Sequence, residues 1–128
     1  MPIEVEFIEE ENTVIMNMIG LLTTEEITAT IRTQLDDRMQ DKPGEVLHAI
    51  YDVTEFEWTF EEFIKYIKSA PSASQGSDGK VQEHFVGTSR WVQQLRTWWK
   101  KRTGKETTAF SSMEDARQYI RNLQARKE

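Results

Sequence analysis

The chain has 128 residues, of which 38% are hydrophobic and 30% charged, and it contains no cysteine. This length fits one domain with a buried core, so we expect residues 1–128 to form a single domain. The lack of cysteine excludes disulfides, thiol nucleophiles and zinc–thiolate sites. No apolar run is long enough to span a bilayer, and the first residues lack a basic or apolar signal-peptide region, so we expect a cytoplasmic protein.

The net charge of −6 conceals a strong asymmetry between the two halves of the chain. Residues 1–64 contain 16 acidic and three basic residues, whereas residues 65–128 contain 13 basic and six acidic residues. The halves therefore have balances of −13 and +7. Such a split can mark a basic surface for an anionic partner, or two halves whose fields cancel on packing.

The N-terminal segment predicts an antiparallel hairpin. Residues 3–7 alternate apolar side chains with Glu4 and Glu6, which is typical of a half-exposed strand. A turn at 10–12 and an apolar strand at 13–19 follow. Because charged side chains blunt the edge of a sheet, we expect the first strand to be an edge strand.

A helix and a third strand come next. Thr23 and Glu26 have the spacing of a capping box, which predicts a helix start. Apolar residues then recur at steps of four, at Ile27, Ile31, Leu35 and Met39. Residues 42–44 end this helix, and residues 46–53 predict a strand.

The middle of the chain predicts a second helix and a flexible connection. Thr59 and Glu62 repeat the capping-box spacing, and the predicted apolar face consists of Phe60, Phe63, Ile64 and Ile67. Residues 69–80 contain Pro71, two glycines and four serines, so we expect them to be the most mobile internal segment.

The last part of the chain predicts two further strand–helix units. A strand at 81–87 precedes a helix capped by Thr88 or Ser89 and ended by Gly104. A short strand at 106–110 precedes a helix with Ser111 and Glu114 in capping-box spacing. Strands that alternate with helices favour an α/β fold with parallel crossovers: a mixed five-stranded sheet, an N-terminal antiparallel hairpin and four helices.

Several short motifs resemble a known family. They are the strand-to-helix stretch 83–91, the hydrophobic–Asp–hydrophobic strand end at 50–53, and the segments 108–110 and 113–117. With this order of elements, the whole chain resembles the SpoIIAA-like branch of the STAS-like superfamily. Its relatives include anti-sigma-factor antagonists and, more distantly, CRAL-TRIO lipid-transfer domains. The resemblance implies a sequential βα superhelix, in a branch where most members have no assigned activity.

One position departs from the family pattern. Anti-sigma-factor antagonists have an Asp-Ser-Ser/Thr-Gly motif with a phosphorylated serine at the start of the helix after the third strand. This chain has Glu-Trp-Thr-Phe-Glu-Glu at 57–62. Thr59 is therefore the candidate phospho-switch residue, but a phosphoryl group there would lie beside Glu61 and Glu62, so an N-cap role is favoured.

Candidate sites for chemistry are few. The sequence has no P-loop, Rossmann fingerprint, nucleophile elbow or His-Glu-x-x-His motif, and we predict no catalytic residue and no cofactor. Two loops remain candidates because ligands of α/β sheets bind at the carboxyl ends of strands. One carries Asp52, Glu55 and Glu57, whose carboxylates could act as general acids or bases. The other carries Thr88 and Ser89, where backbone amides could bind an anion.

The two histidines, His48 and His84, fall on predicted neighbouring strands and on the same face as Asp52. Asp52 lies four residues from His48, roughly 13 Å along a strand, so the three cannot bind one ion together. We predict no metal, and expect histidines that are partly buried or face a dimer partner.

The helix expected after residue 89 has more large apolar side chains than one face can bury. At least one of Trp98 and Trp99 should be partly exposed, close to basic residues. An exposed aromatic beside cations is typical of binding surfaces. The candidate partner or ligand surface comprises Trp91, Trp98, Trp99, Lys100, Lys101 and Arg102.

Two function hypotheses follow. The first is a non-catalytic interaction module that binds a protein partner or itself, with a two-fold homodimer in which Trp98 or Trp99 is a buried anchor. The second is a binder of a small apolar or lipid-like ligand, by analogy with CRAL-TRIO domains, which a pocket lined by Met16, Met18 and aromatic residues would favour. An enzyme using the Asp52 loop is a weaker third option, and we expect no nucleic-acid partner.

Overall fold

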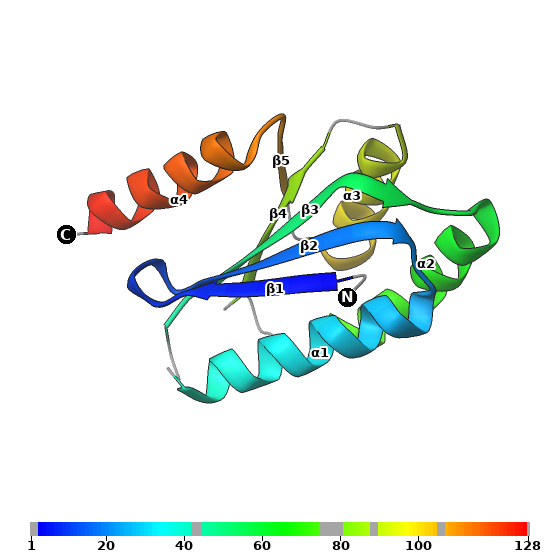
Figure 1. Cartoon of the computed structure of the whole chain (residues 1–128), viewed down its shortest axis with the longest axis horizontal. Helices are drawn as coiled ribbons and strands as arrows, with labels where there is room; N and C mark the ends of the chain where they lie inside the picture. Colours follow the sequence, from blue (N-terminus) through cyan, green and yellow to red (C-terminus); the bar gives the residue numbers. More distant parts are fainter. Residues whose placement is uncertain (1–2, 42–44, 75–80, 88–89, 105–106, 128) are drawn as a thin grey trace.

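A computed structural model describes residues 3–41, 45–74, 81–87, 90–104 and 107–127 of the chain. The described residues form five strands, four α-helices and one short 3₁₀ turn (Figure 1). In chain order these are β1 (Ile3–Ile8), η1 (Glu9–Glu11), β2 (Thr13–Leu21), α1 (Thr24–Asp41), β3 (Leu47–Glu57), α2 (Phe60–Ser74), β4 (Val81–Val86), α3 (Arg90–Thr103), β5 (Thr108–Phe110) and α4 (Met113–Lys127).

The five strands form one mixed sheet whose strand order, β1-β2-β3-β4-β5, equals the sequence order. Only β1 and β2 pair antiparallel, with Val5 opposite Met16; the other neighbouring strands are parallel. The predicted fold class is confirmed. So is the edge position of β1, on which Glu4 and Glu6 are exposed.

Helices cover both faces of the sheet, three on one side and one on the other (Figure 1). Beneath α1, α2 and α3 lies the larger apolar cluster, which includes Met16, Tyr51 and Phe85. On the other face, α4 contributes Ala116 and Ile120 to a smaller cluster with Ile15, Ile50 and Val86. This division follows from strand geometry, because consecutive side chains of β3 and β4 point to opposite faces of the sheet and so pack in different clusters.

Capping residues fix where the helices begin and end. The amide of Glu26 donates to Thr23 Oγ1 at 3.2 Å, and the amide of Thr23 donates to the Glu26 carboxylate at 3.4 Å, as the capping-box prediction requires. At α4 the prediction was wrong by one residue. Ser112, not Ser111, is the cap, since its Oγ accepts from the amide of Asp115 at 3.2 Å. Gly104 ends α3 with φ +76°, as expected for a glycine after a helix.

Two predicted boundaries are wrong. Strand β3 continues past residue 53 to Glu57, because Ile19 and Leu21 of β2 pair with Glu55 and Glu57 after a register shift. Helix α2 continues through Pro71 to Ser74, so the first half of the predicted flexible connection is helical. The mobility prediction for 75–80 and the capping prediction for Thr88 and Ser89 lie outside the described residues.

Candidate functional site

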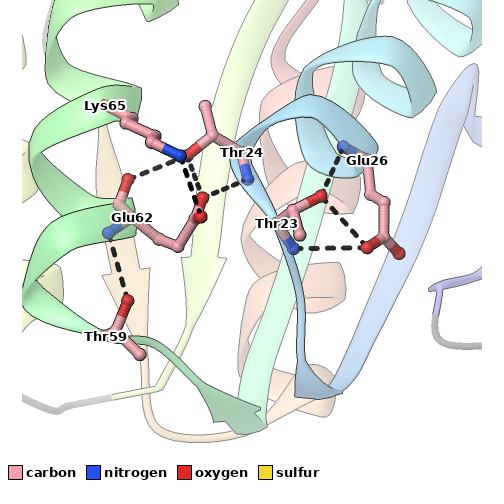
Figure 2. Close-up of polar contacts among 6 residues, drawn as sticks. All are labelled: Thr23, Thr24, Glu26, Thr59, Glu62 and Lys65. Carbon is pink, nitrogen blue, oxygen red and sulfur yellow. Dashed lines mark hydrogen bonds and ion pairs between the residues drawn. The ribbon is translucent and has the colours of Figure 1, made fainter.

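The N-termini of α1 and α2 are joined by one carboxylate. Glu62, in the first turn of α2, accepts hydrogen bonds from the amide and the hydroxyl of Thr24 at 2.7 and 2.8 Å (Figure 2). The Thr24 hydroxyl also donates to the Glu62 carbonyl at 2.8 Å. Because α1 begins just after β2 and α2 just after β3, this contact fixes one end of the molecule.

The electrostatics of Glu62 follow from these bonds. Hydrogen bonds from Thr24 lower the pKa of the Glu62 carboxyl, and Lys65, 3.5 Å away, acts in the same direction. The amide of Glu62 donates to Thr59 Oγ1 at 3.1 Å, so Thr59 is the N-cap residue of α2 (Figure 2). The phospho-switch role of Thr59 stays a prediction.

Two large apolar side chains are exposed at this same end. Phe60 is 79% exposed in the first turn of α2, and Leu21 is 65% exposed at the end of β2. The sequence placed Phe60 on the buried face of its helix, which is wrong. Helical periodicity cannot reveal that the first turn extends beyond the core, and no other signal in the sequence marks it.

Exposed glutamates lie close in sequence to Leu21 and Phe60, and Glu57 pairs with Leu21 across the sheet. Two lie in the first turn of α1, two at the end of β3 and one in the first turn of α2. We call this surface the acidic tip; it comprises Leu21, Glu25, Glu26, Glu55, Glu57, Phe60 and Glu61.

The predicted acid–base loop is not a loop, because Asp52, Glu55 and Glu57 all belong to β3. Asp52 Oδ1 accepts from the amide and hydroxyl of Thr54 at 3.1 and 2.7 Å. Asp52 also lines a groove of about 440 Å³ between β1 and α4, which Glu55 and Glu57 do not line. The three carboxylates therefore do not form one site.

His48 and His84 share the α4 face of the sheet, as their strand parity predicted, and both are buried more completely than the sequence led us to expect. His48 Nδ1 lies 3.1 Å from His84 Nε2, and His84 Nδ1 lies 2.5 Å from Thr108 Oγ1. Burial, and secondarily His48, lower the pKa of His84 to about 4. Among the described residues, no group of three or more His, Cys, Asp or Glu side chains could hold a metal ion.

Helix α3 has a buried stripe and an outer face rich in cations. Val92, Leu95 and Trp99 are buried, so Trp99 cannot be the exposed anchor, whereas Trp98 is partly exposed as predicted. The side chains of Trp91 and Arg102 lie outside the described residues. A shallow hollow of about 380 Å³ is lined by Arg90, Gln93, Gln94, Thr97, Trp98 and Lys101, which we call the cationic face.

A second hollow, of about 220 Å³, adjoins the first along α3 and shares Gln93 and Thr97 with it. Its other lining residues are Arg96, Lys100 and Thr107. The Arg96 guanidinium donates to the Thr107 carbonyl at 2.7 and 3.2 Å. These bonds hold Arg96 against the start of β5, so Arg96 has a structural role there.

The apolar space between the sheet and helices α1–α3 is small. A cavity of about 20 Å³ is lined by Met18 and several aromatic residues, with Met16 not among them. This volume is enough for about one water molecule, not for a lipid. Nearby, the Tyr51 hydroxyl donates to the Glu83 carboxylate at 2.6 Å, and burial raises the pKa of Tyr51.

Within the described part of the chain, none of the helices combines the length and the apolar character needed to cross a membrane.

Comparison with protein-family models and with curated proteins gives no match for the sequence. Solved structures with the same fold include the following two. One is an uncharacterised DUF3478-family protein with a SpoIIAA-like fold from Shewanella loihica PV-4, at TM-score 0.65 and 14% identity, covering 92% of this chain and 91% of that chain. The other is the anti-sigma factor antagonist SpoIIAA in its unphosphorylated form, at TM-score 0.61 and 14% identity, covering 93% and 97%. The chain therefore has the SpoIIAA-like, STAS-like fold that its motifs predicted.

Proposed function

We propose that this chain is a non-catalytic, STAS-like interaction domain that binds a protein partner through the acidic tip. The observation that carries the proposal is the exposure of Phe60, at 79%, at the same end of the molecule as Leu21, which is 65% exposed and pairs with Glu57. Large apolar side chains gathered at one end of a domain, with a charged rim, are typical of a protein-binding surface.

The surrounding charge defines the kind of partner. The five glutamates of the tip favour a partner with basic side chains around an apolar pocket, because opposite charges speed the encounter while a buried aromatic supplies most of the affinity. The bonds between Thr24 and Glu62 support the proposal, since they hold the two glutamate-bearing helix starts together before any partner arrives.

The test is site-specific photo-crosslinking in living cells. A photo-crosslinking amino acid replaces Phe60 in one strain and the exposed Arg32 of α1 in a control strain. We expect discrete protein adducts from position 60 and none from position 32. Equal or absent adducts at the two positions would contradict the proposed function.

A further inference from the structure

We propose that the chain also associates with itself: the acidic tip of one copy docks on the cationic face of α3 in a second copy. This inference rests on the proposed function, because it uses the same tip, and it names one partner, a second copy of this chain.

The cationic face carries positive charge that ion pairs among the described residues do not offset. Helix α3 contains five basic residues and no acidic residue. Within the described ranges, Arg90 and Lys101 take part in no ion pair. The hollow between them therefore favours an anionic occupant.

The same hollow also suits an apolar anchor. Trp98 forms part of its lining and is only partly buried, although it packs on the core beneath α3. An aromatic ring that enters this hollow gains a ring contact with Trp98 and lies about one helical turn from Lys101. The occupant that fits is an aromatic side chain flanked by carboxylates.

The acidic tip presents that combination. Phe60 projects from the first turn of α2, with Glu57 before it and Glu61 directly after it, both exposed. Because Phe60 is 79% exposed, its own α3 does not cover it, and a contact between the two surfaces needs two molecules. The charge split between the halves of the sequence thus becomes complementarity between copies.

The two surfaces differ, so the contact sets one patch against another rather than a patch against itself. In one arrangement, two copies form the contact twice, related by a two-fold axis. In the other, they form it once, which leaves one acidic tip and one cationic face available to further copies. In an open chain of copies, every internal copy uses both surfaces, whereas a single contact between two copies uses one surface of each.

Sedimentation of purified full-length protein at low salt tests the inference. Phe60→Ala removes the anchor, and Lys101→Glu reverses a charge of the hollow at an exposed side chain without touching the core. We expect each variant to self-associate at least about tenfold more weakly than the wild type. Arg32→Glu, the same charge reversal on α1, should leave association unchanged, and added salt should weaken it.

Mixing the two variants gives the decisive result. The Phe60→Ala chain keeps an intact cationic face and the Lys101→Glu chain keeps an intact tip, so an equal mixture should form heterodimers that neither variant forms alone. A wild-type chain that is monomeric up to about 1 mM, or a mixture that stays monomeric, overturns the inference. If position 60 still crosslinks to a different protein in cells, the proposed function stands while self-association fails.

Discussion

His48 and His84 illustrate how single residues tie this fold to pH. The two rings lie 5.3 Å apart between their centres, under α4, and the His84 ring also contacts Tyr119. Two neutral imidazole rings can share one hydrogen bond, between His48 Nδ1 and His84 Nε2. The second ring nitrogen of His84, Nδ1, forms a hydrogen bond with Thr108 Oγ1. Burial disfavours a positive charge on His84, because the charged ring loses its hydration, so His84 favours the neutral state.

We predict that the chain loses stability in mild acid because of His84. The pKa of His84 is lowered to about 4 in the folded state, so its contribution is complete above about pH 6.5 and is lost as the pH falls toward 4. The full effect is about 3 kcal/mol in the free energy of unfolding. Urea unfolding between pH 7.5 and 4.5 measures it. His84→Gln should flatten the profile, and a variant profile parallel to that of the wild type would refute the assignment.

Gly87 shows a second constraint at the scale of one residue. Its φ is +141°, and a Cβ atom built there would lie 3.0 Å from Val53 Cγ2. Its amide donates to the Phe110 carbonyl at 2.9 Å, so the backbone cannot simply move away. Gly104 has a positive φ as well, but open space around its Cβ position.

Gly87→Ala should therefore destabilise the fold more than Gly104→Ala. Both changes place a side chain in a left-handed region, at a cost of roughly 1–2 kcal/mol, and only Gly87→Ala adds a steric clash. Thermal unfolding compares them. Adding Val53→Ala to Gly87→Ala tests the clash directly, because the second change should cost less in that background than in the wild type. Equal costs in both backgrounds would show that the clash is relieved in another way.

At the scale of elements, α1 and α2 are positioned by one carboxylate as well as by packing. The Glu62 carboxylate accepts a hydrogen bond from the amide of Thr24, at the start of α1, while the start of its own helix is capped by Thr59. A residue of α2 therefore satisfies a backbone donor that α1 cannot satisfy within its own helix. A carboxylate near a helix N-terminus also interacts favourably with the helix dipole. The neighbouring Glu61 is exposed and has no such partner among the described residues.

This contrast gives a matched pair of variants. Glu62→Ala should lower the melting temperature by a few degrees, whereas Glu61→Ala should leave it nearly unchanged. Because the pKa of Glu62 is lowered in the folded state, its contribution is present above its ordinary value of 4.5 and is lost in stronger acid. Melting curves at pH 7 and pH 3 should show the difference between the variants shrink. A difference that persists at pH 3 would mean that packing, not charge, is responsible.

At the scale of the whole molecule, one sheet serves two cores. Neighbouring residues such as Ile50 and Tyr51 of β3 face α4 and the three-helix layer in turn. Neither core can lose its helices without exposing strands that the other core shares. We therefore propose that the chain is a single cooperative domain.

One unfolding transition should then be seen from both faces. All four tryptophans lie outside α4, so their fluorescence reports on the three-helix side. The chain has no cysteine, and Gln118→Cys at an exposed position of α4 provides a unique labelling site. The two probes should give coincident urea curves. A label transition at lower urea would show that α4 detaches first.

Local signals explain which features the sequence predicts. Capping residues such as Thr23 and Thr59, and the alternation around Glu4 and Glu6, act within a few residues, so the helix starts and the edge strand could be predicted. Pairing across the sheet could not be predicted in this way, because β3 extends to Glu57 only where it pairs with Leu21 of β2.

The candidate site depends on such long-range facts. The contact between Thr24 and Glu62 spans 38 residues, and the exposure of Phe60 depends on where the core ends. The sequence predicted that Trp98 or Trp99 would be partly exposed near the cations of α3, but not which of the two. It did not predict that the exposed glutamates at the end of β3 and at the starts of α1 and α2 lie at the same end of the molecule as Leu21 and Phe60.

The identity of strand order and sequence order has a consequence for synthesis on the ribosome. Each strand pairs with the strand made just before it, so no pairing encloses more than one helix and its connections, and the sheet can grow by adding one strand at a time. The antiparallel hairpin can form first and offer its open edge, β2, as a template for β3. Helix α4 is made after β5, so the paired histidines stay accessible to solvent until this helix emerges and closes over them.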